Sequence, residues 1–216
     1  MRIHSVNVSM PTEIEYRGRM VSTGIFKEPI DGRVMLRRLN LDGDGQADLV
    51  AHGGVHKAAY IYPLAHYAYW QRELGRDDFT MGQFGENFTV EGMDEDSVSI
   101  GDRYRFGAAL VEVSQPRSPC FKLGIRMGAP DFLKPFLQSS MVGFYVRVLE
   151  AGEVGAGDQI ELVARPPDSL TVRQINHLYY FDKTNVELLR RAEAIETLSP
   201  GWREGFAEIL AEAEGR

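Results

Sequence analysis

Val111-Glu112-Val113-Ser114-Gln115-Pro116-Arg117-Ser118-Pro119-Cys120-Phe121-Lys122 joins an alternating apolar strand to the only cysteine of the chain. Proline fixes φ and pushes the residue before it toward extended geometry, so Pro116 and Pro119 are incompatible with a helix or a central strand at this point. We therefore expect a rigid, extended turn that presents Cys120 at a defined place.

Two cations lie close to Cys120 in the sequence, Arg117 and Lys122. Nearby positive charge stabilises a thiolate, so we expect it to lower the pKa of the thiol. A lone intracellular cysteine is more often a small buried apolar residue. The combination of two prolines and two cations favours a functional thiol in this chain.

The composition indicates a globular protein with a real core. The chain has 216 residues, 44% apolar and 25% charged, with a net charge of −7. That charge argues against nucleic acid as a partner, but it leaves room for a local basic pocket that holds one phosphorylated ligand. A single cysteine excludes an internal disulfide. No signal peptide or bilayer-length apolar run is evident, so we expect a cytoplasmic protein without membrane association.

Outward from the cysteine segment, the first three quarters of the chain are typical of antiparallel β-structure. Residues Ile3–Ser9 alternate as a strand, and Val142–Leu149 is a strongly β-like run. The pairs Gly101-Asp102 and Gly157-Asp158 predict turns between strands. The apolar and aromatic periodicity of Leu64–Leu74 predicts one helix.

The chain changes character at Pro166-Pro167, where the β-pattern stops. Helical periodicity then predicts three short helices, at 171–180, 185–197 and 200–213. We predict two domains, residues 1–165 and 166–216. Because so short a helical module is marginal alone, we expect it to pack on the β domain or on another subunit, the latter giving a homodimer.

Two glycine-rich loops are candidates for ligand contacts. In His52-Gly53-Gly54-Val55-His56-Lys57, the glycine amides can form an anion-binding nest, and the two glycines argue against a helical zinc pair of histidines. A plain glycine turn is an equally good interpretation. In the second loop, Gly82–Val90, the pair Glu86-Asn87 predicts polar groups held toward a site, although a solvated turn would look similar. A third stretch, Leu41–Asp48, is interpreted as a glycine-rich turn, since it lacks the closing glutamate of a calcium loop.

In this order, the pieces resemble the MOSC domain, named for the C-terminal part of molybdenum cofactor sulfurases. The matching pieces are His52-Gly53-Gly54 with Lys57, Gly82–Phe88, Gly101-Asp102, Gln115–Cys120 and Gly152–Asp158. The helical tail resembles the extension of the bacterial YiiM-type subgroup. The resemblance implies a mainly β fold, a β-barrel, followed by a small three-helix module. It also implies a molybdenum cofactor with Cys120 as the protein ligand to the metal.

The resemblance further implies an oxidoreductase that reduces N-hydroxylated compounds such as hydroxylaminopurine-type base analogues. Electrons would come from a separate reductase partner. We expect Arg117, Lys122 and Lys57, with the amides of Gly53 and Gly54, to hold the cofactor's phosphate. Protons would come from His52 or a metal-bound water. The remaining predicted pocket residues are Glu86 and Asn87.

Two other classes of function stay open on the sequence. The chain would be a carrier module if it held the cofactor, or sulfur as a Cys120 persulfide, for delivery elsewhere. It would be an interaction domain if the thiol were buried and inert.

Overall fold

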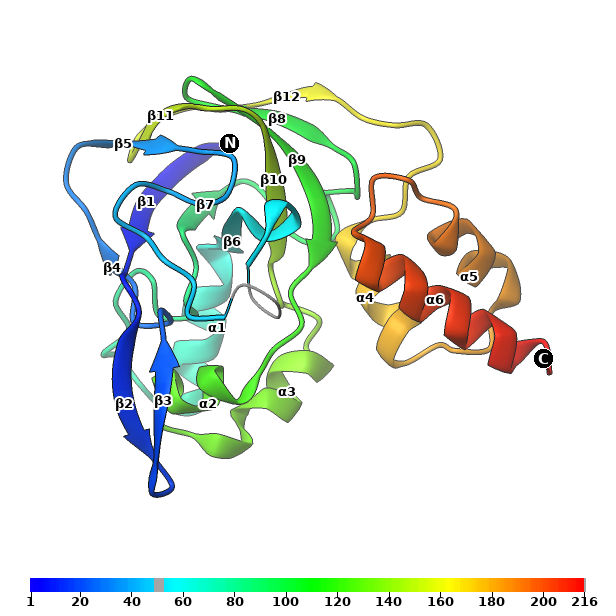
Figure 1. Ribbon diagram of the computed structural model, residues 1–216, viewed down its shortest axis with the longest axis horizontal. Coiled ribbons are helices and arrows are strands. Elements are labelled where there is room, and N and C mark those ends of the chain that lie inside the picture. The colour runs from blue at the N-terminus through cyan, green and yellow to red at the C-terminus, as the bar shows by residue number, and fades with distance from the viewer. Residues whose placement is uncertain (49–52, 216) are drawn as a thin grey trace.

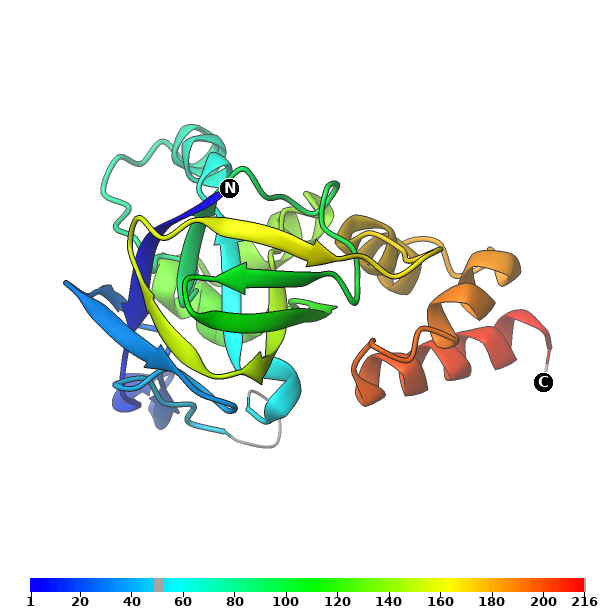
Figure 2. The same ribbon diagram turned by 90° about the horizontal axis from the view of Figure 1, so that it is seen from above.

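The computed structural model describes residues 1–48 and 53–215 and is dominated by one eight-stranded sheet with the order β12-β8-β9-β10-β6-β7-β1-β4 (Figures 1 and 2). All its strand pairs are antiparallel except β6 with β7. Its strands are β1 (Arg2–Val8), β4 (Glu28–Pro29), β6 (Ala59–Pro63), β7 (Phe88–Glu91), β8 (Arg103–Phe106), β9 (Ala109–Pro116), β10 (Phe144–Glu150) and β12 (Ile160–Ala164). Two two-stranded antiparallel sheets accompany it, the hairpin β2 (Thr12–Tyr16) with β3 (Arg19–Thr23), and the long-range pair β5 (Arg33–Leu36) with β11 (Gly152–Gly155).

The predicted β-rich domain is present, but the sheet is open, and within the described residues no closed barrel is found. The sheet curls until β1 comes close to the start of β12 (Figure 2). There the contact is one bridge, Arg2 with Gln159, and a few backbone hydrogen bonds such as Ile3 N to Asp158 O at 2.9 Å. The strand at the end of the sheet, β4, is two residues long and pairs with the opposite end of β1, at Asn7 and Val8.

Strand register places one set of side chains in the core and another on the opposite face. Phe144 and Val146 of β10 belong to the main hydrophobic cluster. Between them, Tyr145 is paired with Tyr60 of β6 and with Gln115 of β9. Since side chains alternate along a strand, these three residues lie on the face away from that cluster.

A second, aromatic cluster packs beneath this other face, around Tyr62, Phe84, Trp70 and Phe136. It is covered by α1 (Ala65–Leu74), α2 (Phe121–Met127), the short 3-10 helix η2 (Pro130–Phe132) and α3 (Leu133–Gln138). A further 3-10 turn, η1 (Val55–Lys57), precedes β6. The predicted helix at 64–74 is confirmed as α1, and Gly75 ends it in a left-handed conformation with φ 62°.

The three predicted tail helices are confirmed as α4 (Val172–Tyr180), α5 (Val186–Glu193) and α6 (Pro200–Ala213). Thr171 caps α4 in a reciprocal capping box with Gln174. Residues 1–165 are called the β domain below, and residues 166–215 the helical tail. Apolar side chains of both belong to one hydrophobic cluster, so the tail packs on the β domain. The predicted division at 165/166 falls between β12 and α4.

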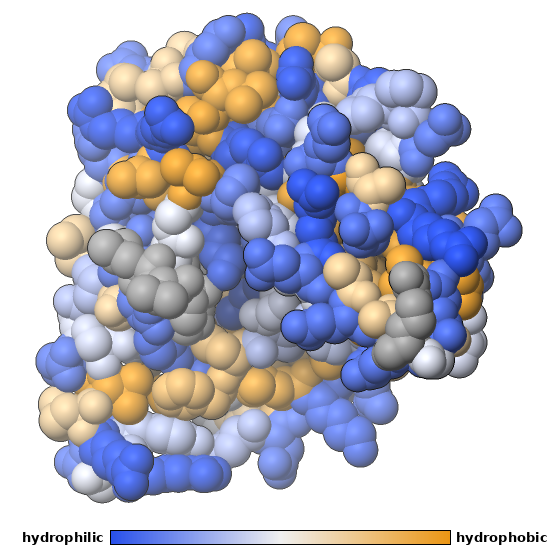
Figure 3. All heavy atoms as spheres, turned by 45° about the vertical axis from the view of Figure 1, so that its right-hand side comes forward, coloured by the Kyte–Doolittle hydropathy of each residue, from blue (hydrophilic) through white to orange (hydrophobic). Residues whose placement is uncertain are grey.

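The tail is also tied to the sheet by polar contacts. The Ser199 amide donates to Ser114 O of β9 at 3.0 Å, and the Arg147 guanidinium of β10 donates to Thr197 O. The molecule is hollowed where tail and β domain meet (Figure 3). Over the described residues, the structure has no helix with the length and apolar character needed to span a membrane.

Candidate functional site

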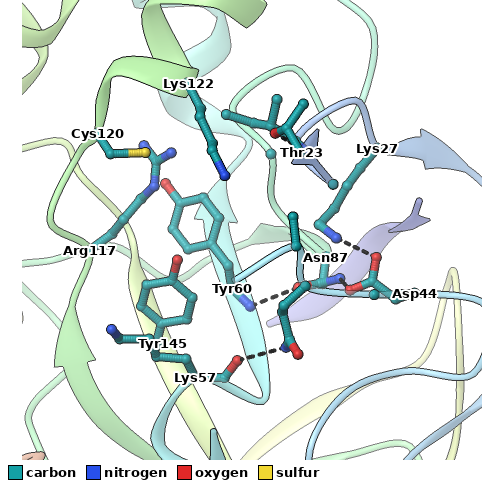
Figure 4. Close-up of a pocket in the computed structure, with 16 residues that line it drawn as sticks. Thr23, Lys27, Asp44, Lys57, Tyr60, Asn87, Arg117, Cys120, Lys122 and Tyr145 are labelled. Atoms are coloured by element: carbon teal, nitrogen blue, oxygen red, sulfur yellow. Dashed lines mark hydrogen bonds and ion pairs between the residues drawn. The ribbon is translucent and has the colours of Figure 1, made fainter. Parts of the chain in front are cut away.

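Cys120 lies at the end of an extended turn, as the two prolines predict. Strand β9 ends at Pro116, and Cys120 itself is extended, with φ −122° and ψ 168°, immediately before α2. Its carbonyl accepts the first turn's hydrogen bond from Leu123 N at 2.9 Å. The side chain is half-buried and lines a pocket (Figure 4). The turn therefore presents the thiol to a cavity.

This first cavity, called the basic pocket below, has a volume of about 90 Å³. It lies between the turn of Cys120, the face of β6 and β10 that carries Tyr60 and Tyr145, and the loops that follow β3 and β5. Its lining is Thr23, Gly24, Ile25, Lys27, Asp44, Gly45, Gln46, Ala47, Lys57, Tyr60, Gly85, Asn87, Arg117, Cys120, Lys122 and Tyr145. The charged side chains of this lining comprise four cations and one carboxylate, in a chain whose net charge is −7.

Arg117 is the most unusual of these cations, because its side chain is 5% exposed and incompletely bonded. The guanidinium lies over the rings of Tyr60 and Phe136, at 4.9 and 5.6 Å from their centroids. Its Nη1 has no hydrogen-bond partner among the described residues. Burial acts to lower the pKa of Arg117, but the nearby hydroxyl and thiol groups, including Tyr60 and Cys120, raise it overall. In Figure 4 the sulfur of Cys120 lies beside this guanidinium.

Lys57 and Lys122 add positive charge from two other elements. Lys57 is the last residue of η1, and Lys122 lies in the first turn of α2 with its side chain directed into the pocket (Figure 4). Burial lowers the pKa of Lys57, an effect that Asp48 opposes. The three predicted cations, Arg117, Lys57 and Lys122, are therefore brought together around one pocket with Cys120.

The fourth cation, Lys27, is held by the only carboxylate of the lining, Asp44. Both side chains are buried, and burial lowers the pKa of Lys27. Asp44 also accepts hydrogen bonds from Ser9 N and from Asn87 Nδ2, each at 2.9 Å. This buried pair fixes the turn at residues 41–48 against the floor of the pocket.

The predicted pair Glu86-Asn87 splits between two positions. Asn87 lines the basic pocket, where its Oδ1 accepts from Tyr60 N at 3.0 Å and its Nδ2 donates to Asp44. Glu86 is fully buried behind the pocket and is not part of its described lining. Its carboxylate accepts from the hydroxyl of Tyr67 and from Thr89 Oγ1 at 2.8 Å, and from Gly82 N and Phe84 N, each at 3.0 Å. Burial raises the pKa of Glu86. Glu86 thus shapes the loop that carries Asn87.

The predicted glycine loop is described only in part, since His52 lies outside the described residues. Gly54 precedes η1 with φ 90° and ψ 171°, a conformation that L side chains rarely adopt. Its carbonyl accepts from Lys57 N at 3.0 Å, which closes the turn that positions Lys57. Gly53 lines a second cavity rather than the basic pocket.

This second cavity, called the aromatic cavity below, has a volume of about 570 Å³ and meets the first at three shared lining residues, Lys57, Cys120 and Tyr145. It is bounded by both the β domain and the helical tail. Its lining is Gly53, His56, Lys57, Gln115, Ser118, Pro119, Cys120, Tyr145, Tyr179, Tyr180, Ser199, Pro200, Gly201 and Trp202. Cys120 therefore lies at the junction of two cavities of different chemistry.

Several site residues were not predicted from the sequence. Tyr60 and Tyr145 are strand residues whose proximity, with ring centroids 5.2 Å apart, depends on the pairing of β6 with β10. Alternation predicts which face each occupies, but it does not predict the pairing partner. The pattern at Leu41–Asp48 predicts a turn, and nothing local signals that Asp44 is buried under the pocket.

Metal binding would rest on one protein ligand. The described part of the chain has no cluster of three or more His, Cys, Asp or Glu side chains suited to hold a metal ion. A metal contact through Cys120 would therefore require that most other ligands come from the cofactor itself.

Comparison with known proteins gives matches along most of the chain. The family described as MOSC domain matches residues 48–161, and the family described as YiiM-like, 3-alpha helix domain, matches residues 170–212. The chain is 43% identical over 202 residues to YflK of Bacillus subtilis, covering 94% of this chain and 91% of YflK. It is 36% identical over 182 residues to YiiM of Escherichia coli, covering 83% of this chain and 81% of YiiM.

A solved structure and a longer relative extend this comparison. The crystal structure of YiiM from Geobacillus stearothermophilus superimposes with a TM-score of 0.83 at 38% identity, covering 97% of this chain and 99% of that one. A Gibberella moniliformis protein named reductase is 34% identical over 175 residues, which are 80% of this chain but 31% of that protein.

Proposed function

We propose a function from the premise that this chain belongs to the MOSC domain family, in the branch that carries a YiiM-like three-helix domain. On that premise, the chain binds a molybdenum cofactor at Cys120 and reduces N-hydroxylated small molecules, hydroxylaminopurine-type base analogues among them. A separate reductase delivers the electrons. The fungal relative named reductase supports redox chemistry for the family.

The observation that carries this proposal is the buried guanidinium of Arg117 beside the thiol of Cys120. A buried donor without a partner costs about 1–3 kcal/mol, and more when it is charged. Nη1 of Arg117 is such a donor, and it lies in a pocket that Lys57 and Lys122 also line. An anionic group in this pocket would remove that cost. The phosphate of the molybdenum cofactor is an anion of suitable size for the basic pocket.

The donor set at the junction fits the metal. A thiolate is a soft ligand of the kind that a sulfur-coordinated metal takes, and Cys120 is held on a stiff turn between the two cavities. When bound, the cofactor provides the redox-active metal through which electrons reach the N–O bond.

The chain's own residues would supply binding and protons. Conversion of R–NH–OH to R–NH₂ and water consumes two electrons and two protons, which cleave the N–O bond. Burial raises the pKa of Tyr145, so its hydroxyl keeps its proton at the junction of the cavities. Tyr145 can therefore donate a hydrogen bond to the oxygen that leaves. His52 remains our proposed proton relay on sequence grounds alone.

The test is to produce the protein in a host that makes the cofactor and to measure molybdenum and pterin in the purified chain. We expect the wild type to carry both and Cys120→Ala to lose molybdenum, because the only protein ligand is removed. Ser118→Ala, in the same turn, should retain both. Full molybdenum content in Cys120→Ala would contradict the ligand assignment, and absence of metal and pterin from the wild type would contradict the proposed function.

Turnover separates an enzyme from a carrier. The test supplies loaded protein with a reductase already shown to deliver electrons to another enzyme that reduces N-hydroxylated compounds. Under these conditions the protein should convert 6-hydroxylaminopurine to adenine. Loaded protein without turnover would favour the carrier alternative, in which Cys120 holds cofactor or persulfide for delivery.

A further inference from the structure

The aromatic cavity has a wall that the helical tail supplies. Tyr179 and Tyr180 come from the end of α4, and Trp202 from the first turn of α6. The ring of Trp202 lies 4.6 Å from that of Tyr179 and 6.2 Å from that of Tyr180, centroid to centroid. Three rings from two helices thus form one side of a cavity that opens on Cys120.

Hydrogen bonds fix the position of this wall relative to the turn of Cys120. The hydroxyl of Tyr180 donates to Ser118 Oγ at 2.9 Å, which joins α4 to the turn two residues before the thiol. The Ser199 amide, at the start of α6, donates to Ser114 O of β9 at 3.0 Å. A molecule that lies against the tail wall therefore has a defined position relative to Cys120.

The opposite wall comes from the β domain and carries polar groups. Tyr145 and Gln115 project from the paired strands β10 and β9, and His56 and Lys57 come from η1. Ligand sites commonly combine aromatic surface with a few polar groups in a volume of about 300–1,000 Å³. The aromatic cavity, at about 570 Å³, fits that description.

We infer that the aromatic cavity is the substrate site and that the helical tail selects the substrate. The rings of Tyr180 and Trp202 provide a surface for the substrate to stack on, and the absence of a side chain at Gly201 leaves space for it. This inference rests on the proposed function, and it assigns substrate choice to residues outside the MOSC-matched segment. A planar heteroaromatic N-hydroxylated compound gains stacking contact with such a wall, whereas an aliphatic one does not.

Gly201 offers a direct way to alter this wall. It is exposed, lies in the first turn of α6 and lines the cavity, and a Cβ built there would have no neighbour within 4 Å. A Cβ at 201 therefore meets no clash, and a larger side chain there can extend across the mouth of the cavity. Ala207, exposed on the same helix, is not part of the described lining and provides a matched control.

The experiment compares Gly201→Phe and Ala207→Phe with the wild type, using full-length protein from a cofactor-producing host. Binding of 6-hydroxylaminopurine is measured by quenching of tryptophan fluorescence, since Trp202 lines the cavity. Turnover is measured with 6-hydroxylaminopurine and with acetohydroxamic acid, a small aliphatic comparator. Molybdenum and pterin content are measured in every variant.

We expect Gly201→Phe to weaken binding of 6-hydroxylaminopurine by about tenfold or more and to raise its KM similarly, by loss of space in a pocket that contacts the substrate. Its cofactor content and its KM for acetohydroxamic acid should stay within about twofold of the wild type. Ala207→Phe should match the wild type throughout. Unchanged binding in Gly201→Phe, or an equal loss for both compounds, would overturn the inference.

Two further arms keep the inference testable. If Gly201→Phe does not fold, Gly201→Ala and Tyr180→Leu replace it, with a smaller loss of 6-hydroxylaminopurine binding expected for each. If no protein shows turnover, the proposed function fails, but the binding arm still decides the inference. If 6-hydroxylaminopurine quenches the fluorescence of the wild type but not that of Gly201→Phe, the cavity is supported as the substrate site. If it does not quench the wild type, the inference is overturned.

Discussion

The two cavities that meet at Cys120 differ in their chemistry and in the parts of the chain that build them. The basic pocket is lined only by β-domain residues and gathers four cations around one carboxylate. The aromatic cavity is lined partly by the tail, whose rings come from α4 and α6. The described lining of the basic pocket thus lies entirely within the β domain, whereas the aromatic cavity forms only where the tail packs against that domain.

This difference suggests separate control of two properties. Changes within the basic pocket should act on cofactor retention, and changes in the tail wall should act on substrate KM. The shared residues, Lys57, Cys120 and Tyr145, should act on both.

Replacement of Arg117 should have the largest effect and should be confined to the basic pocket. We expect Arg117→Met to weaken cofactor retention by about a hundredfold, about 3 kcal/mol, because the buried charge that would pair with the anion is gone. Without cofactor, the variant should unfold at the same or a higher denaturant concentration than the wild type, since an apolar side chain replaces a buried, incompletely bonded cation.

Cofactor retention is measured by pterin release on dilution of loaded protein, and stability by urea unfolding of protein made without cofactor. Arg126→Met is the control, because Arg126 is also partly buried with an unbonded Nε but lines neither cavity. Equal cofactor loss in both variants would show that the effect is not specific to the pocket.

Glu86→Gln should reduce stability from behind the same pocket. The carboxylate accepts four hydrogen bonds. In the variant, the amide NH₂ is a donor that would face some of these donors, so hydrogen bonds would be lost inside the fold. We therefore expect the free energy of unfolding to fall by about 1–3 kcal/mol. Exposed Glu13 provides the control, as Glu13→Gln removes the same charge without burial.

Glu86 should also leave a signature in the dependence of stability on pH. Burial raises the pKa of Glu86 in the folded state above the ordinary value of 4.5. Its contribution to stability is therefore greatest below the unfolded-state pKa and is lost as the pH rises through the folded-state pKa. The stability advantage of the wild type over Glu86→Gln should therefore shrink as the pH rises above the ordinary pKa of a glutamate. An advantage that grows as the pH rises would show that the carboxylate is stabilised as the anion.

Lys57→Gln should affect both cavities, because Lys57 lines both. We expect about a fivefold loss in cofactor retention and a similar rise in KM, each equivalent to about 1 kcal/mol. The effect is modest because the charge of Lys57 is only partly buried and is partly screened by solvent. Exposed Lys134→Gln is the matched control. A change in only one property would assign Lys57 to a single cavity.

Tyr180→Phe should have the smallest effect and should act only on the aromatic cavity. The variant keeps the ring but loses the 2.9 Å hydrogen bond to Ser118, worth about 0.5–1.5 kcal/mol. We expect a rise of a few fold in KM for 6-hydroxylaminopurine with unchanged molybdenum content. Tyr69→Phe, on α1 and outside both linings, should change neither. Loss of molybdenum in Tyr180→Phe would show that the tail supports the cofactor site too.

Local patterns predicted much of the fold. The tail helices and α1 follow from periodicity at short range, where each residue's contacts lie within a few positions. The sheet's closure could not be predicted in the same way. Whether a curled sheet closes depends on how far its two edges overlap, and here β1 meets the start of β12 at one bridge, Arg2 with Gln159.

The sequence predicted Lys57 and Asn87 as pocket residues, and both line the basic pocket, but local chemistry alone explains only the part of the site next to Cys120. Pro116 and Pro119 determine an extended turn at Cys120, and their restriction of φ needs no tertiary contact. The cations Arg117 and Lys122 accompany the thiol for the same reason. Glu86, by contrast, was predicted as a pocket residue, and the structure directs its carboxylate into its own loop.

The sequence by itself determined a stiff turn bearing a thiol between two cations, a β-rich domain and three helices at the end. Only the tertiary structure decided what surrounds that thiol. Strand register brought Tyr60 and Tyr145 together, and packing of the tail added three rings to the cavity wall. The fold also buried Arg117 with no partner for Nη1 among the residues that the structure describes. These contacts join residues far apart in the chain, so they depend on strand pairing and helix docking that no local pattern specifies.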